Sequence, residues 1–103
     1  MPAYHVSKDN YLHVVESYTI GHYRGEDSGA IYPEYEFRDV ETYNLNPIKN
    51  FKIRNKTNKT IEELVQESCR QYPYAGEMFT SPQAKEIYSY IETLEDVSNI
   101  RIL

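Results

Sequence analysis

The chain has 103 residues, a net charge of −5 and 40% hydrophobic residues, an ordinary composition for a soluble globular protein. A chain of this length rarely holds two separate cores, so we expect a single domain over residues 1–103. No apolar run approaches the roughly 20 residues that a membrane-spanning helix needs. The N-terminal residues lack the basic and apolar regions of a signal peptide, and Cys69 is the only cysteine. We therefore expect a cytoplasmic protein.

The first quarter of the chain is typical of β-structure. Residues 4–7 predict a short strand that ends in a turn at 8–10. β-branched and aromatic residues alternate from 12 to 23 and predict the longest strand. The stretch 24–29 holds two glycines and predicts a polar loop without a phosphate-binding pattern. The two sides of the long strand carry Leu12, Val14, Tyr18 and Ile20 on one and His13, Val15, Ser17 and Thr19 on the other.

Residues 31–44 allow two interpretations. Pro33, followed by acidic residues, suits the first turn of a helix. The alternation of aromatic and charged residues over 34–38 suits a strand, and this is the interpretation that we favour. Further along, the sequence predicts a turn at 44–47 and a short strand at 51–54.

Two helices are predicted in the C-terminal half. Thr60 and Glu63 form a capping box ahead of the first helix, and Pro73 ends it. Ser81 and Pro82 are the cap and the first residue of the second helix. Residues at helical spacing form one apolar stripe on each: Ile61, Leu64, Val65, Ser68, Cys69 and Tyr72 on the first, and Ala84, Ile87, Tyr88, Ile91 and Leu94 on the second.

These elements predict an α+β fold. A small, mainly antiparallel sheet comes from the N-terminal half and from a last short strand at 100–103. The two helices of the C-terminal half cover one face of that sheet and supply its hydrophobic partner.

Tyrosine and charge are both unevenly distributed. The chain has eleven Tyr and no Trp, and seven of the tyrosines lie within the first 43 residues. Six acidic residues lie between Glu26 and Glu41, and five basic residues lie between Lys49 and Lys59. Such segregation is either two solvated surfaces that complement each other or a bipolar surface that orients a partner. The acidic net charge argues against direct nucleic-acid binding.

Candidate catalytic groups are few. His5 and His13 can meet across a hairpin, but a zinc site would need two more ligands. Cys69 lies in an apolar stripe, where a thiol is a poor nucleophile. We therefore expect no catalytic residue, no metal site and no cofactor.

One alternative rests on a resemblance to a known family. Tyr4, His5, Val6 and Ser7 resemble the opening of ADP-ribosyltransferase-like domains, in which that histidine contacts the nicotinamide dinucleotide. The passage 70–84 is loosely similar to a helix–loop–strand segment of small members. The resemblance implies His5 as a dinucleotide contact, in an active or a degenerate domain. The chain departs from the family in being shorter and in lacking a late glutamate motif.

The function that these observations favour is binding to another macromolecule without catalysis. Small size, surface-suited tyrosines and segregated charge are typical of a compact inhibitor or adaptor, of the kind that phages and mobile elements encode. The expected partner is another protein, basic or itself a nucleic-acid-binding protein. The predicted contact is the tyrosine-rich acidic segment, with Tyr32, Glu34, Tyr35, Glu36, Asp39 and Tyr43 as partner-binding residues.

Overall fold

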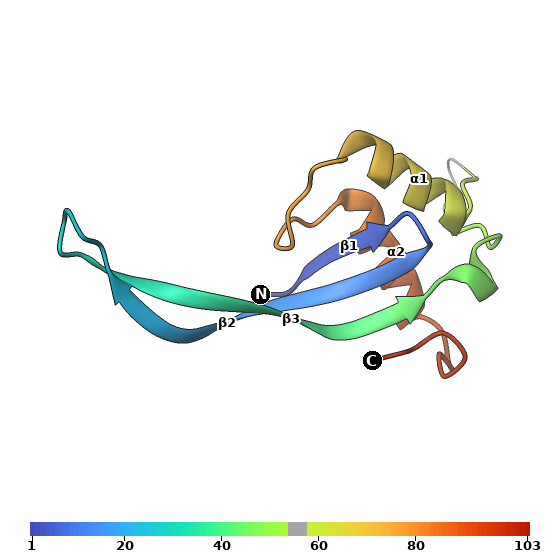
Figure 1. The fold of residues 1–103 in the computed structure, drawn as a ribbon. Helices are drawn as coiled ribbons and strands as arrows, with labels where there is room; N and C mark the ends of the chain where they lie inside the picture. The colour runs from blue at the N-terminus through green and yellow to red at the C-terminus, as the bar shows by residue number, and fades with distance from the viewer. Residues whose placement is uncertain (54–57) are drawn as a thin grey trace.

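The computed structural model describes residues 1–53 and 58–103 of the chain. The strands β1, β2 and β3 form an antiparallel sheet in that order, and both α-helices lie on one of its faces (Figure 1). The expected α+β fold is therefore confirmed. In chain order the elements are β1 (Ala3–Ser7), β2 (Tyr11–Arg24), β3 (Ile31–Asn44), the 3-10 turn η1 (Asn46–Ile48), α1 (Ile61–Gln71) and α2 (Pro82–Glu92).

Both helices begin where their caps predict. The Thr60 hydroxyl accepts a hydrogen bond from the Glu63 N–H, and the Glu63 carboxylate accepts one from the Thr60 N–H, at 3.2 and 3.1 Å. The Ser81 hydroxyl accepts from the Ala84 N–H at 3.0 Å, with Pro82 as the first residue of α2. Each cap satisfies backbone donors that the first helical turn leaves free.

The hydrophobic core lies between the two helices and the adjoining end of the sheet. Leu64 of α1 and Ile87 of α2 are fully buried, as their apolar stripes predict. Leu12 of β2 and Leu45 after β3 are fully buried against the same cluster. The helices thus cover only that part of the sheet where β1, β2 and β3 lie together.

Beyond that part, two strands continue alone. β1 pairs only with residues 11–15 of β2, whereas β2 and β3 pair with each other out to Arg24 and Ile31. We call residues 16–38 the arm and the rest of the chain the body (Figure 1). The radius of gyration is 16.5 Å and the longest extent is 53 Å. A compact chain of this length would have a radius of about 13 Å, so the arm makes the molecule elongated.

The segment 31–44 is strand throughout, which excludes the helical interpretation and extends the predicted strand at both ends. Its hydrogen-bonding partner is β2, whose equal length supports pairing over the whole arm. Pro33 is accommodated because β3 has a free edge there, where a missing N–H leaves no ladder bond unmade.

Two short strands predicted from the sequence are reduced to isolated bridges. Over 51–53 the sole bridge among the described residues joins Lys52 to Thr60, and Arg54 lies outside them. This segment instead leads into α1, since the Phe51 carbonyl accepts the N–H of Ile61. At the chain end, Arg101 bridges to Tyr43 of β3 without forming a full strand.

Candidate interaction surface

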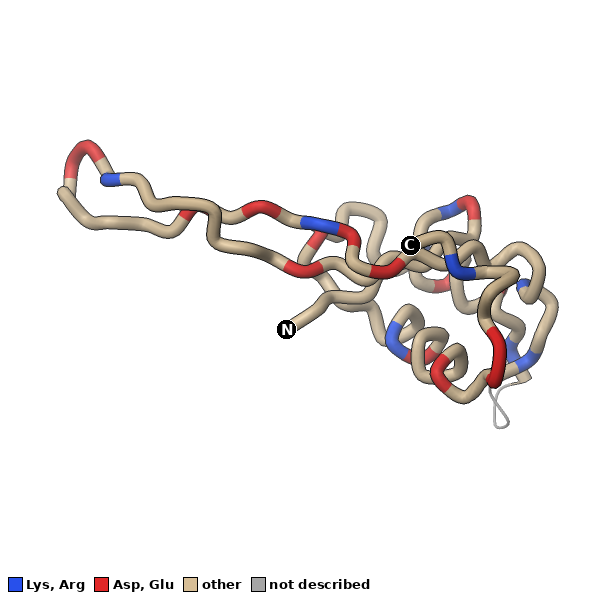
Figure 2. Tube along the Cα trace, turned by 90° about the horizontal axis from the view of Figure 1, so that it is seen from below, with Lys and Arg blue, Asp and Glu red and all other residues tan. Residues whose placement is uncertain are grey.

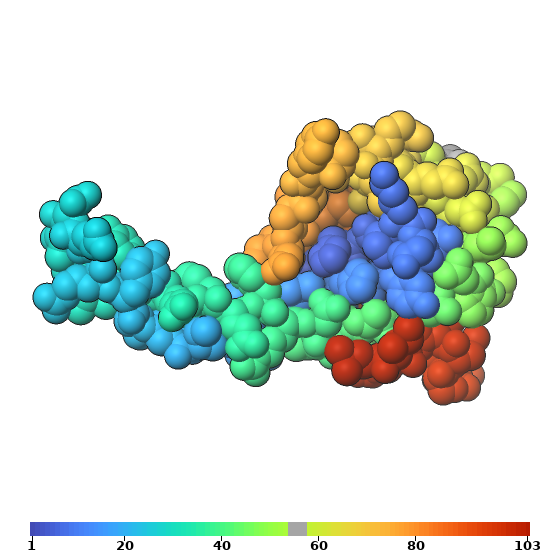
Figure 3. Space-filling model, in the orientation of Figure 1, coloured from blue at the N-terminus to red at the C-terminus, as the bar shows by residue number. Residues whose placement is uncertain are grey.

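The arm exposes an unusual number of large apolar side chains. In the space-filling view it projects from the body, which packs the helices and the root of the sheet together (Figure 3). Single exposed apolar residues are normal on protein surfaces, so it is their grouping on one hairpin that makes the arm a candidate interaction surface. Between 38% and 62% of the surface of each of these residues is exposed: Tyr18, Ile20, Tyr23, Ile31, Tyr32, Tyr35 and Phe37.

The pairing register sorts these side chains onto two faces. Residues directly opposite each other in an antiparallel pair share a face, and faces alternate along each strand. The helix-side face is continuous with the core and carries the pairs Tyr18–Glu36, Gly21–Glu34 and Tyr23–Tyr32. The open face, which the helices do not cover, carries the pairs Ser17–Phe37, Thr19–Tyr35, His22–Pro33 and Arg24–Ile31.

The helix-side face combines tyrosines with charged groups that hold one another in place. The Tyr18 hydroxyl donates to Glu16 at 2.9 Å, and the Arg38 guanidinium lies 4.8 Å from the Tyr18 ring centre. Arg38 also donates to Glu36 at 2.7 Å, which lowers the pKa of that carboxyl. Further out, the rings of two tyrosines, Tyr23 and Tyr32, lie 5.6 Å apart. The arm therefore presents tyrosines in defined positions among charges.

The open face is more apolar. Ile31, Pro33, Tyr35 and Phe37 follow one another along β3 on this face. Where the arm meets the body, the same face is hollowed, and the hollow is lined by His5, His13, Val15, Phe37, Asp39 and Glu77.

Five of the six predicted contact residues lie on the exposed hairpin, but on different faces. Tyr32, Glu34 and Glu36 are on the helix-side face. Tyr35 is on the open face, and Asp39 lies at the root of that face opposite Val15. A single flat partner surface cannot contact all five, so the predicted set splits into two.

Tyr43 does not belong in the contact set. It is only 3% exposed, because its ring packs into the core. Its hydroxyl donates to Glu41 at 2.5 Å, and the Tyr88 hydroxyl of α2 donates to the same carboxylate at 3.0 Å. Burial and this carboxylate raise the pKa of Tyr43 to about 12 and raise that of Tyr88 as well. The cluster fixes β3 to the helices at the point where the arm begins.

Sequence reasoning missed exposed residues on both strands. Tyr18 and Tyr23 of β2 were assigned only to a strand, and Ile31 and Phe37 of β3 only to an ambiguous segment. Strand length is the feature that could have revealed them. Both strands are longer than the body of a 103-residue chain can cover, so their ends are exposed.

The histidines meet as the hairpin predicts. His5 and His13 are paired across β1 and β2, and their rings stack with centres 5.0 Å apart. His13 Nδ1 lies 3.1 Å from a carboxylate oxygen of Asp39. Partial burial, and then the neighbouring His13, lower the pKa of His5. Within the described ranges, 1–53 and 58–103, no group of three or more ligating side chains is positioned to hold a metal ion.

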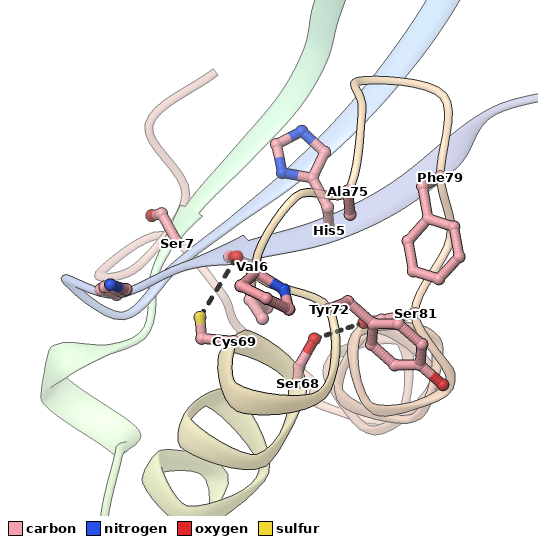
Figure 4. Close-up of a pocket in the computed structure, with 11 residues that line it drawn as sticks. His5, Val6, Ser7, Ser68, Cys69, Tyr72, Ala75, Phe79 and Ser81 are labelled. Carbon is pink, nitrogen blue, oxygen red and sulfur yellow. Dashed lines mark hydrogen bonds between the residues drawn. The ribbon is translucent and has the colours of Figure 1, made fainter.

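A second hollow, of about 190 Å³, lies between β1, the end of α1 and the loop before α2 (Figure 4). Its polar groups serve packing. The Ser68 hydroxyl donates to Ser81, and the Cys69 thiol lies 3.8 Å from the Val6 carbonyl oxygen. Partial burial raises the pKa of Cys69, which disfavours the reactive thiolate.

Two cations in the described part of the basic segment contact carboxylates of α1. Lys49 lies 3.6 Å from Glu62, and Lys59 donates to Glu67. These cations therefore complement the first helix and not the acidic arm.

The loop passage does not follow the helix–loop–strand pattern of the ADP-ribosyltransferase resemblance. Residues 72–80 form no strand, and they lead directly into α2. Comparison with family models, with curated proteins and with solved structures gives no match. Of the helices in the described part of the chain, none has the length and apolar character required to cross a membrane.

Proposed function

We propose that the protein binds another protein without catalysis, as an inhibitor or adaptor, and that the helix-side face of the arm is the contact. The observation that carries this proposal is the arm itself. Two strands leave the body and carry exposed aromatic side chains beyond the part of the sheet that the helices cover. An isolated two-stranded hairpin is marginally stable in water, so such an extension brings little benefit to the fold.

Charge supports a basic partner. Seven acidic and two basic residues lie between Glu16 and Glu41, so this segment carries a net charge of −5, equal to that of the whole chain. The remaining residues balance each other. Most of the acidic positions lie on β3 and in the loop at the tip, and β2 contributes only Glu16 (Figure 2). A localised charge of this kind steers a complementary partner toward the arm and increases the association rate.

The tyrosines supply the contact energy in this proposal. Tyrosine presents a large rigid ring with only two side-chain torsions, so it loses little entropy on binding. Tyr23 and Tyr32 form a ring pair near the tip, and Tyr18 is held by Arg38 nearer the body. Aromatic anchors inside a charged rim are the common arrangement of binding hot spots.

The test is affinity capture from cell lysate, with the protein immobilised through its exposed residue Met1. Parent protein is compared with a Tyr23→Ser, Tyr32→Ser double variant. Tyr74→Ser is the matched control, because Tyr74 is 97% exposed but lies in the loop before α2. We expect a protein that parent and control retain and the double variant loses. Equal capture by all three would overturn the arm as the contact.

A further inference from the structure

We propose that the open face of the arm is covered by a second copy of this chain. The two arms would pack face to face and antiparallel, related by a two-fold axis that passes beside Tyr35. This pairing leaves both helix-side faces outward, so it does not depend on the function proposed above.

The two faces of the arm differ in how apolar they are. On the open face, Ile31, Pro33, Tyr35 and Phe37 form a continuous apolar stripe, and Arg24 at the far end is the only formally charged residue of its four pairs. The helix-side face alternates tyrosines with carboxylates. Homodimer interfaces are more apolar than transient ones, which keep charged residues.

The edges of the arm are poorly suited to self-association. Pro33 lies on β3, which among the described residues pairs only with β2 in the arm, and it removes one backbone donor. The register of β2 shifts between Thr19 and Gly21, so a bulge at Ile20 interrupts the other strand. Proline and bulges are devices that prevent edge-to-edge pairing. The stripe on the open face is therefore the surface left for a second copy.

The register follows from spacing along β3. Ile31 and Asp39 are each four residues from Tyr35, about 13 Å at strand rise. A two-fold axis beside Tyr35 therefore places Ile31 of each copy over the root of the other arm. The hollow at that place has the apolar side chains of Val15 and Phe37, and His5, His13, Asp39 and Glu77 complete its lining. Ile31 is the most exposed of the large apolar side chains on the arm, at 62%, and would fill this hollow in the second copy.

The positions of the charged residues support the same register for the dimer. Arg24 is paired with Ile31, so it lies at the far end of the stripe on the open face. Antiparallel arms bring Arg24 of each copy over Val15 and beside Asp39 of the other. Asp39 contacts His13 through one oxygen and retains acceptor capacity for a guanidinium. The carboxylates of the helix-side face point away from the contact, which limits like-charge repulsion.

The surface area that the two arms can bury indicates a weak dimer. Aromatic side chains bury about 150–250 Å² each, so the half-exposed Tyr35 and Phe37 with Ile31 offer roughly 300 Å² per copy. The two copies together then bury roughly 600 Å² from these side chains, and the facing strands add to this, so the total lies at or below the low end of specific interfaces, about 1,200 Å². We therefore expect a dissociation constant in the micromolar range.

Sedimentation velocity of the full chain from about 1 to 300 µM tests this directly. The parent should shift from monomer to dimer over this range. Ile31→Glu should weaken the dimer at least tenfold. Tyr32→Ser is the matched control, because Tyr32 is the next residue, 42% exposed but on the opposite face, and it should leave the dimer unchanged.

A charge exchange tests the register. Arg24→Asp and Asp39→Arg should each weaken the dimer, and the double variant should restore it, with circular dichroism confirming that each chain is folded. A parent that stays monomeric at every concentration would overturn the proposal. So would a dimer that Tyr32→Ser abolishes and Ile31→Glu does not. A monomeric parent leaves capture of a foreign protein through Tyr23 and Tyr32 unaffected, so the two proposals fail separately in that case. A dimer that needs Tyr32 would instead place the second copy on the helix-side face.

Discussion

One strand, β2, belongs to both the body and the arm, and the two parts differ in what their side chains contact. In the body, Leu12, Val14 and Val15 are at most 2% exposed. In the arm, Tyr18 and Tyr23 are 38% and 56% exposed. The residue types and the alternation are similar along the whole strand. Burial is therefore decided by the elements that lie against the strand, and not by the strand itself.

The two parts should also differ energetically. The body buries apolar side chains from both helices and from the sheet in one cluster. The arm consists of two strands that pair with each other beyond the part of the sheet that β1 and the helices cover. Substitutions in the body should therefore lower stability, whereas substitutions in the arm should change association.

The largest effect is expected in the core. Leu64→Ala or Ile87→Ala should each lower the free energy of unfolding by about 2–5 kcal/mol, because both side chains are fully buried. Chemical denaturation measures this. Ile31→Ala is the matched arm variant, because Ile31 is 62% exposed, and it should change the free energy by less than about 0.5 kcal/mol when measured as a monomer. Comparable losses in all three would remove the distinction between body and arm.

The cluster at the junction should give the next largest effect. Glu41→Ala leaves the hydroxyls of Tyr43 and Tyr88 without their acceptor and should cost about 1–3 kcal/mol. Denaturation of this variant beside Tyr88→Phe separates the loss of the carboxylate from the loss of one hydroxyl. An unchanged midpoint for Glu41→Ala would mean that the junction is held by packing alone.

The same cluster predicts a pH dependence. The folded state holds the Tyr43 proton up to a pKa of about 12, whereas the unfolded chain loses it near the ordinary value of 10.0. Because the folded state binds more protons in this window, stability should be full below about pH 10 and fall toward pH 12. Unfolding followed across this range by fluorescence measures the fall, which Tyr88→Phe should reduce.

Binding should show a smaller free-energy change with no loss of stability. Tyr32→Ser should weaken binding to the captured partner at least tenfold, about 1.4 kcal/mol, as expected for an aromatic anchor. Glu34→Lys should slow association mainly at low salt, because an exposed charge acts through steering. Surface plasmon resonance at two salt concentrations distinguishes the two effects.

His5→Ala should leave binding unchanged, whereas a dinucleotide-dependent activity lost with His5 would favour the enzymatic alternative.

Removal of a helix cap should have a modest effect confined to the body. Thr60→Ala deletes the side-chain acceptor of the capping box and should cost about 1 kcal/mol. Denaturation measures it, and Thr93→Ala at the end of α2 is a comparison that removes no N-cap. Equal small effects from both would indicate that α1 depends on packing and not on its cap.

The capping residues in the sequence correctly predicted where the two helices begin. Thr60, Ser81 and Pro82 determine where α1 and α2 begin through contacts within a few residues, so the sequence alone contains the information. The pairing of His5 with His13 followed from one short turn. Such features need no knowledge of the rest of the fold.

Long-range features were not predictable in this way. Nothing near Tyr43 shows that it lies over α2 and is buried, whereas Tyr35 eight residues earlier is half exposed. Whether Tyr32 and Tyr35 share a face depends on register and on the bulges in the hairpin. The sequence predicts a contact segment that the structure shows to be largely exposed, whereas the division of that segment into two faces follows only from the three-dimensional structure.

Shortening the arm tests most directly whether it serves binding and not folding. Ser17 and Phe37 lie opposite each other, so an Asn-Gly turn can replace residues 18–36 and close the hairpin. We expect the free energy of unfolding of this variant, measured by chemical denaturation at monomeric concentrations, to stay within about 0.5 kcal/mol of the parent. A loss of several kcal/mol would show that the arm is part of the stable fold and would contradict this account.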